Sequence, residues 1–345
     1  MNQVYFKYPH NNFFTHLKQE TMPLTFSAIE SIGEASGFII APFIVSDALP
    51  IVLLHESKAS THPLPMEKRE ASTENTVALI GEDDEKIAYT EAFNICHHAL
   101  CAEEVSKVVL ARTALANCEI DETAYERLFI TACQENPSCY VCLFSTTLTG
   151  TWLSITPEAL LESSDAKHFH TMALAGTLPA SRQNYHDAAF WPAKHVREQA
   201  LVAQYIRQML QELNINVEQG SIGVKQMQQL LHLCTDFYFD LPDKVTLPQL
   251  INKLHPTPAV GGLPKAEALH LIAEAEKNER RYYAGFMGEY RQKGKTVLFV
   301  TLRCVEILAK TLIFHAGGGL LTESNAEDEW EETCRKIATI ASNLH

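Results

Sequence analysis

Positive charge is scarce in this sequence. Its 345 residues include 28 Lys and Arg against 42 Asp and Glu, which gives a net charge of −14. An acidic chain repels nucleic-acid phosphates and anionic lipid surfaces, and no Lys/Arg-rich run interleaved with aromatic residues offsets that repulsion. We therefore expect no nucleic-acid partner and no membrane partner. A small anionic ligand remains compatible with the sequence, because a local pocket can differ in sign from the whole chain.

Long apolar runs are missing as well. The most apolar stretches, residues 38–45 and 49–54, are interrupted by Pro42 and Pro50. Both are far shorter than the roughly 20 residues that span a bilayer. The first residues lack the basic start, apolar core and small-residue cleavage site of a signal peptide. We therefore expect a cytoplasmic protein without a membrane span.

The cysteines do not form a disulfide pattern. Nine is an odd number, and their scattered positions suit reduced thiols in an intracellular protein. The one close pair, Cys139 and Cys142, lies in a predicted strand, where residues three apart face opposite sides. Sharing a metal or forming a redox turn is therefore disfavoured, and we predict that both thiols belong to the core.

The remaining composition is that of a globular protein, with 46% hydrophobic and 20% charged residues. The sequence predicts helices at about 90–104, 123–135, 194–213, 264–279 and 326–344, and strands at 107–116, 140–144, 151–155, 296–305 and 311–315. Because helices and strands cluster instead of alternating, we predict an α+β fold with antiparallel sheets. No change of composition marks a second domain. We expect one domain over 1–345, with a variable N-terminal part (1–85, mobile or variable around 57–73) and a catalytic core (86–345).

A carboxylate interrupts the apolar face of the predicted helix 194–213. With each residue turning the helix by about 100°, Glu198 falls in the middle of that face. The neighbouring residues of the face are His195, Leu201, Val202, Tyr205 and Met209. Burying an unpaired carboxylate costs several kcal/mol, so Glu198 must be protonated, paired with a cation or bound to a metal. A buried salt bridge to an arginine is the simplest of these alternatives.

A second cluster of acids lies near the C-terminus, with six between Glu323 and Glu332. On a helix beginning at Ala326, three of them point away from the apolar face and suit a solvated first turn. Glu329 and Glu332 instead flank that face, together with Lys336. With Glu198, these two glutamates could form an oxygen-rich site for a hard divalent cation.

Three further features allow two interpretations each. The strand at 311–315 runs into Gly317, Gly318 and Gly319, which form either a tight turn or a loop whose amides approach an anionic ligand. Arg303 lies in an apolar strand and makes either a core salt bridge or a fork for a carboxylate. Lys107 begins another strand, as an edge charge or as a desolvated amine that can serve as a base. The contexts of a P-loop and of a dinucleotide site are absent.

Nine ordered sequence blocks resemble those of the chorismate-utilising enzymes. They are KVVLAR (107–112), TPEALL (156–161), LAGT (174–177), KHVREQALV (194–202), HPTPAVGGLPK (255–265), YYAGFMGEY (282–290), TLRC (301–304), HAGGG (315–319) and EDEWEETCRK (327–336). The resemblance covers about 86–345 and is greatest to the isochorismate synthases. It implies the fold of anthranilate synthase component I, in which two antiparallel sheets form a sandwich with helices outside and a deep cleft between.

The resemblance also implies a chemistry. Mg²⁺ would be held by Glu198 and Glu332, with Glu329 nearby, and would bridge to the ring carboxylate of chorismate. Lys107 would be the general base and Glu158 the general acid of a reversible isomerisation. Water would attack C2 of the ring, and the C4 hydroxyl would leave.

The substrate-binding residues implied by the resemblance come from several blocks. Arg303 and Tyr283 would hold the enolpyruvyl carboxylate, assisted by the amides of Gly317 to Gly319. The others would be Gly176 and Thr177 beside the ring and its carboxylate, His232 near the leaving hydroxyl, Ala259 in the pocket and Lys336 near the metal site. For His232, a satisfied core histidine is the alternative.

Two positions argue for water as the nucleophile. Enzymes of this family that add ammonia generally lack the lysine found here as Lys107, and one type often has lysine where this chain has Ala175. No glutamine amidotransferase partner is then expected, and relatives independent of ammonia are commonly monomers. Salicylate synthases usually have threonine at the position of Ala259.

Tyr283 nevertheless occurs in members with pyruvate-lyase activity, so a salicylate synthase is the main alternative. A chorismate-binding protein without turnover is another, and the complete set of candidate residues argues against it. Menaquinone supply is favoured over a siderophore or salicylate pathway for a lone cytoplasmic enzyme.

Overall fold

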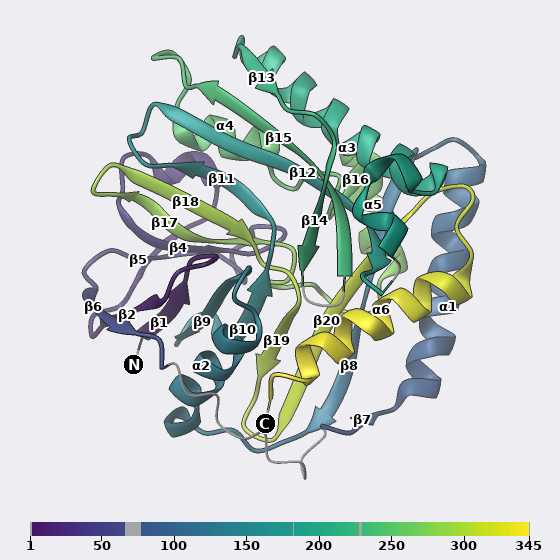
Figure 1. The fold of residues 1–345 in the computed structure, drawn as a ribbon. Helices are drawn as coiled ribbons and strands as arrows, with labels where there is room; N and C mark the ends of the chain where they lie inside the picture. Colours follow the sequence, from purple (N-terminus) through teal and green to yellow (C-terminus); the bar gives the residue numbers. More distant parts are fainter. Residues whose placement is uncertain (1, 66–76, 182, 228–229, 345) are drawn as a thin grey trace.

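The computed structural model describes residues 2–65, 77–181, 183–227 and 230–344, and these form two antiparallel sheets with helices around them (Figure 1). The first sheet has the order β16 (Gly262–Leu263), β8 (Lys107–Asn117), β20 (Thr311–Leu320), β19 (Cys304–Ile307), β10 (Gly150–Thr156), β9 (Tyr140–Thr146), β1 (Asn2–Lys7), β2 (Phe13–Gln19) and β6 (Lys58–Pro63), and β7 (Leu79–Ile80) also pairs with β8. The second has the order β13 (Val217–Gln219), β15 (Leu230–Asp240), β12 (His168–Pro179), β11 (Ala159–Ser163), β18 (Lys295–Val300), β17 (Phe286–Gln292), β4 (Gly37–Ala41), β5 (Ile51–Leu54) and β3 (Leu24–Phe26), and β14 (Gly223–Met227) also pairs with β15. The predicted α+β class is confirmed.

The helices pack on the outside of this arrangement (Figure 1). They are α1 (Glu82–Cys101), α2 (Tyr125–Glu135), α3 (Ala193–Glu212), α4 (Leu247–Leu254), α5 (Lys265–Ala275) and α6 (Ala326–Ala341), with short 3₁₀ turns at Ile29–Ile32, Glu122–Ala124, Gln183–His186 and Ala188–Phe190. Helix α3 contacts β12 of the second sheet, whereas α1 and α6 contact β8 and β20 of the first. The candidate carboxylates are therefore carried by helices that pack on different sheets: Glu198 by α3, and Glu329 and Glu332 by α6.

The predicted helices are present with shifted ends. Helix α1 begins at Glu82 instead of near residue 90, because four consecutive acids in its first turn favour the positive end of the helix dipole. Helix α5 ends at Ala275, four residues before the predicted 279. Helix α4 was not predicted.

Two predictions about strands are wrong, and both concern candidate site residues. The apolar run 296–305 is two strands in different sheets, since the chain leaves β18, turns at Arg303 with a φ of 44°, and enters β19. Gly317 to Gly319 do not form a loop or a tight turn. They continue β20 and pair with residues 109–111 of β8.

The N-terminal part belongs to both sheets. Strands β1, β2 and β6 extend the first sheet, and β3, β4 and β5 extend the second. Of the segment expected to be mobile or variable, 58–63 is strand β6, and 66–73 lies outside the described residues. Each of the nine cysteines is a free thiol, and Cys139 and Cys142 are fully buried, which confirms the prediction of core thiols.

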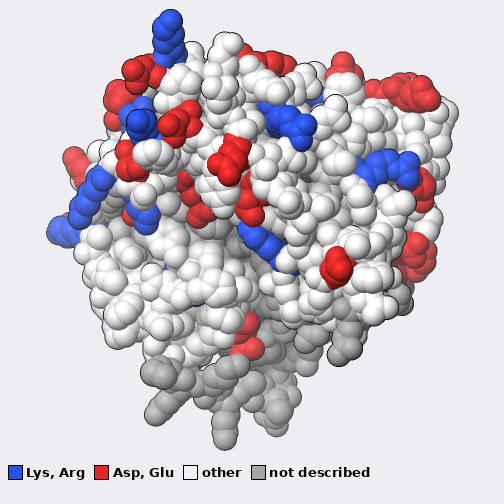
Figure 2. All heavy atoms as spheres, turned by 45° about the horizontal axis from the view of Figure 1, so that its top comes forward, with Lys and Arg blue, Asp and Glu red and all other residues white. Residues whose placement is uncertain are grey.

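Charged side chains are mixed in sign on the outer surface. Figure 2 shows one face of the molecule, on which acidic and basic side chains lie among each other, mainly over its upper half. Within the described ranges, no helix is long and apolar enough to cross a membrane.

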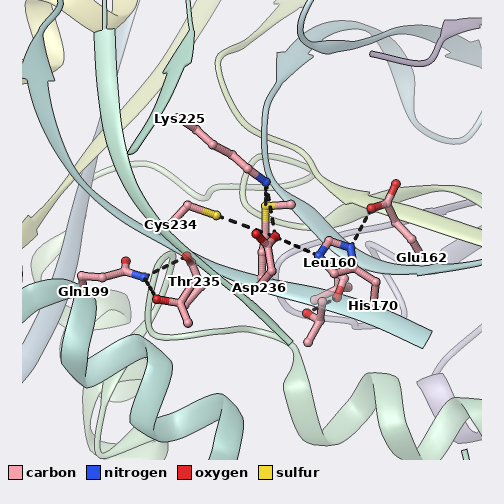
Figure 3. A network of polar contacts seen from close by, with 11 residues as sticks. Leu160, Glu162, His170, Gln199, Lys225, Cys234, Thr235 and Asp236 are labelled. Carbon is pink, nitrogen blue, oxygen red and sulfur yellow. Dashed lines mark hydrogen bonds and ion pairs between the residues drawn. The ribbon is translucent and has the colours of Figure 1, made fainter. Parts of the chain in front are cut away.

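A partly buried histidine connects three strands of the second sheet (Figure 3). The ring of His170 lies between Glu162 and Asp236, with 2.9 Å from Nδ1 to Oε2 of Glu162 and 2.9 Å from Nε2 to Oδ1 of Asp236. Lys225 also pairs with Asp236, at 3.4 Å. Burial alone would lower the pKa of His170, but the bonds to Asp236 and Glu162 outweigh it and raise the pKa to about 9. Both ring nitrogens can then donate, so His170 acts as a cation between two carboxylates.

The stability contributed by His170 should depend on pH. Because its folded-state pKa lies above the ordinary value near 6.5, this contribution is complete below about pH 6.5 and disappears as pH rises through about 9. We expect His170→Gln to lower the free energy of unfolding by on the order of 2 kcal/mol at pH 6.5, and by much less at pH 10. Urea unfolding of wild type and variant at both pH values measures this. The exposed His168→Gln is the control, and an equal loss at both pH values for His170→Gln would contradict the assignment.

Candidate active site

The predicted site residues lie around one cleft between the two sheets. It has about 670 Å³ of empty space, including its open mouth. Twelve predicted residues line it, namely Glu158, Gly176, Thr177, Glu198, His232, Ala259, Tyr283, Arg303, Gly317, Gly319, Glu332 and Lys336. Lys107, Gly318 and Glu329 do not line it. Lys107 is paired with Glu198, Gly318 lies between Gly317 and Gly319, and Glu329 lies beside Gly318.

Lys107 and Glu198 form an ion pair that joins the first sheet to α3. Lys107 lies on β8, between β16 and β20, and is completely buried. Its Nζ is 3.0 Å from Oε1 of Glu198, whose side chain is 10% exposed. The buried carboxylate predicted from the helical wheel is therefore paired, although its partner is a lysine and not an arginine.

The glycines of β20 make room for these side chains. A Cβ atom on Gly319 would lie 2.1 Å from Oε1 of Glu198 and 3.1 Å from Cε of Lys107. One on Gly317 would lie 2.8 Å from the Tyr283 hydroxyl. These glycines thus serve the site by lacking a side chain, so that polar groups can lie directly over the strand.

The other two candidate carboxylates also have lysine partners. Glu332 accepts a hydrogen bond from Lys336 at 2.7 Å, and Lys336 donates another to the Gly317 carbonyl at 2.7 Å. Glu329 is paired with Lys194 and accepts a bond of 2.8 Å from the Ser324 hydroxyl. Burial raises the pKa of Glu329, and the charge of Glu332 raises it further. Burial acts the same way on Glu332, but the Lys336 ammonium outweighs it and holds that pKa below its usual value.

The three glutamates are candidate ligands for a metal ion. Three carboxylates supply the hard oxygen ligands that Mg²⁺ prefers. Among the described residues, however, no three Asp, Glu, His or Cys side chains are placed to hold an ion together. Each carboxylate instead faces a lysine. The donors fit Mg²⁺ in kind, and the Mg²⁺ site stays a prediction.

Glu158 is the one cleft carboxyl held in its neutral form. It follows β10 and is 3% exposed. Burial raises its pKa to about 8, against the opposing charges of Lys107 and Lys336. At neutral pH this side chain therefore carries a proton that it can donate.

Arg303 and His232 form a second polar pair on the cleft wall. His232 Nδ1 lies 3.1 Å from the Gly176 carbonyl, so Nδ1 donates and Nε2 is free to accept from Nη2 of Arg303. Burial and the charge of Arg303 keep the pKa of His232 well below its usual value. Nη1 of Arg303 is buried without a hydrogen-bond partner in the described part of the chain. The guanidinium can thus still bind an anionic group of a ligand.

Two polar residues at the site, His315 and Lys194, were missed by sequence reasoning. His315 lines the cleft, and its ring stacks on Tyr283 with 5.5 Å between centroids. Lys194 pairs with Glu329. Both lie inside recognised blocks: His315 precedes the glycines, and Lys194 lies one helical turn before Glu198. Their positions within these blocks could have identified both residues as candidates for the site.

Known proteins resemble this chain along most of its length. A model of the family described as chorismate binding enzyme matches residues 18–345. A putative isochorismate synthase of Mycobacterium tuberculosis is 32% identical over 69% of this chain and 67% of its own length. The vibriobactin-specific isochorismate synthase of Vibrio cholerae is 29% identical over 74% of this chain, and the chain aligns to 65% of that protein, just under two thirds.

Solved structures show the same fold. The structure of a putative 2,3-dihydroxybenzoate-specific isochorismate synthase from Bacillus anthracis has a TM-score of 0.82, with 22% identity over 99% of this chain and 96% of that chain. Anthranilate synthase component I from Streptococcus pneumoniae has a TM-score of 0.68 at 15% identity, over 99% of this chain and 90% of that one. The predicted fold of anthranilate synthase component I is confirmed.

The family model, which matches residues 18–345, shows that the chain belongs to the chorismate-binding enzyme family. The two curated relatives described above are named isochorismate synthases, that of Mycobacterium tuberculosis as putative.

The neutral carboxyl of Glu158 should lower the stability of the protein. Since its folded-state pKa is raised, folding is penalised as pH rises above the ordinary value of 4.5, and the penalty is complete above about pH 8. We expect Glu158→Gln to increase the free energy of unfolding by on the order of 2 to 4 kcal/mol at pH 8 and by little at pH 5. Urea unfolding at both pH values measures the difference, with the exposed Glu267→Gln as control. A less stable Glu158→Gln protein at pH 8 would refute the buried neutral carboxyl.

Proposed function

We propose that the protein is an isochorismate synthase, a Mg²⁺-dependent enzyme that reversibly converts chorismate to isochorismate. The observation that carries the proposal is a lysine and a protonated glutamate beside the same cleft. Lys107 is buried next to Glu198, and Glu158 is held neutral by burial. A base and an acid are both required when one hydroxyl is added to a ring and another leaves it.

The proton transfers follow from these two groups. Lys107 takes a proton from a water molecule that attacks C2, and Glu158 gives its proton to the departing C4 hydroxyl while the ring double bonds shift. Lys107 acts as the base in its neutral form.

Binding relies on the cationic groups of the cleft. Arg303, oriented by His232 and with a buried N–H to spare, binds the enolpyruvyl carboxylate together with Tyr283. Gly176 and Thr177 lie beside the ring, and Ala259 belongs to the apolar wall. Gly317 to Gly319 belong to a strand and not to a loop; β8 pairs with one edge of this strand, and on its other edge the pairing with β19 ends at His315, so amides on that edge can still assist at the carboxylate.

Mg²⁺ would be held by Glu198 and Glu332, with Glu329 next to them. When bound, it neutralises the ring carboxylate of the substrate, which would otherwise meet three protein carboxylates. Each of these glutamates faces a lysine in the structure, which is consistent with a site that requires positive charge.

The wider assignment rests on the same residues. Lys107 and Ala175 favour water over ammonia, so we propose a cytoplasmic monomer that acts without a glutamine amidotransferase. Menaquinone supply is our preferred pathway, while siderophore and salicylate pathways need the same chemistry. Salicylate synthase remains the second candidate because Tyr283 lines the cleft.

Product analysis tests the reaction. We expect chorismate and Mg²⁺ to give isochorismate as the main early product, followed by chromatography together with salicylate and pyruvate. Salicylate and pyruvate as the main early products would replace our assignment by salicylate synthase. Stabilisation by chorismate without any product would indicate a binding protein.

The acid and base are tested by substitution. Lys107→Ala and Glu158→Gln should still bind chorismate in calorimetry, yet turn over at least about 10²-fold more slowly, because each proton transfer contributes about 10² to 10⁴-fold. Activity of the wild type should also decrease as pH rises through about 8, where Glu158 loses its proton in the free enzyme. Near-normal turnover by either variant would exclude that residue from its role.

A further inference from the structure

Lys194 occupies an unusual place beside the three carboxylates. It lies in the first turn of α3, four residues before Glu198, so the two side chains leave the same face of the helix. Its ion pair is nevertheless with Glu329 on α6, 2.5 Å away, while Glu198 pairs with Lys107. Lys194 thus connects α3 to α6 at the predicted cation site.

Lys194 supplies one of the positive charges at the predicted cation site. Its ammonium is paired with Glu329, whereas Glu198 is paired with Lys107 and Glu332 with Lys336. In the free protein, Lys194 therefore provides for Glu329 the positive charge that a bound divalent ion would otherwise provide.

The three lysines of the site differ in how firmly they are held. Lys107 is completely buried, and moving it would leave an ammonium unsolvated in the protein. Lys336 is 16% exposed and bound to the Gly317 carbonyl as well as to Glu332. Lys194 is 26% exposed, and among the described residues its one hydrogen-bonding partner is Glu329. With its long flexible stem, it is the lysine that can move into water at least cost.

We propose that Lys194 is a built-in substitute for the divalent cation: it neutralises Glu329 in the free protein and is displaced when the ion binds. This inference rests on the proposed Mg²⁺-dependent function. It explains how the buried Glu329 is stabilised without an ion, and it means that a metal ion must compete with a charge that belongs to the protein.

If Lys194 competes with Mg²⁺, removing the Lys194 charge should have two opposite effects: lower stability of the free protein and tighter binding of Mg²⁺. Lys194→Met keeps most of the aliphatic stem and loses the ammonium. We expect the free variant to have a lower melting temperature than the wild type, because the glutamates repel each other. We expect its Mg²⁺ dissociation constant, measured by calorimetry without chorismate, to be about tenfold lower, since no charge has to be displaced.

A matched control lies on the same helix. Arg197→Met removes one positive charge three residues away, from an exposed pair with Glu323 in which the arginine side chain is 57% exposed. Its Mg²⁺ affinity should stay within about twofold of the wild type. Lys194→Gln, which keeps a hydrogen-bond donor for Glu329, should also bind Mg²⁺ more tightly and replaces Lys194→Met if that variant does not fold.

The outcomes separate this inference from the proposed function. Unchanged or weaker Mg²⁺ binding by both Lys194 variants would overturn the inference, and the function would stand if the wild type still makes isochorismate with Mg²⁺. Absence of Mg²⁺ binding in wild type and variants alike would overturn the inference together with the metal requirement. Tighter Mg²⁺ binding by Arg197→Met as well would mean that the change in net charge alone explains the effect, and this result would also overturn the inference.

Discussion

The ion pair between Lys107 and Glu198 is the contact on which the cleft depends. It joins β8 of the first sheet to α3, which packs on the second, at 3.0 Å and almost out of contact with water. A buried charge must be matched closely, since losing one partner leaves an uncompensated ion and costs about 3 to 5 kcal/mol. The pair also requires Gly319, because any side chain there would collide with Glu198. One contact thus constrains a strand, a helix and a glycine from three distant parts of the sequence.

The residues of the cleft were predicted from the sequence more accurately than the strands that carry them. The apolar face around Glu198 showed that a buried carboxylate needed a cation, and the pattern from Ala326 placed Glu329 and Glu332 beside it. The partner could not be read from that pattern, because Lys107 is brought to Glu198 by the pairing of β8 with β16 and β20. Arg303 was misplaced for the same reason. Residues 296–305 are apolar throughout, and only the tertiary arrangement decides that the chain changes sheets there.

Gly317 to Gly319 lie at the cleft, as predicted, but they were predicted to form a loop or turn and instead form a strand. Three glycines in a row are typical of turns, and the sequence offered no means of seeing that they pair with β8 over their whole length. The space above them is what the site uses. Lys194 was missed because a lysine in the first turn of a helix is ordinary, and only the folded protein reveals that it pairs with Glu329 of α6.

The cleft opposes the charge of the whole molecule. A chain with a net charge of −14 gathers Lys107, Lys194, Lys336 and Arg303 around one cavity and keeps Glu158 neutral. The central claim is that these groups promote the attack of water on C2 of the chorismate ring. The most direct measurement is mass spectrometry of isochorismate formed from chorismate in ¹⁸O-labelled water. Our account predicts one ¹⁸O atom at the C2 hydroxyl, and an unlabelled product, which would mean that the hydroxyl moves within the substrate, would contradict it.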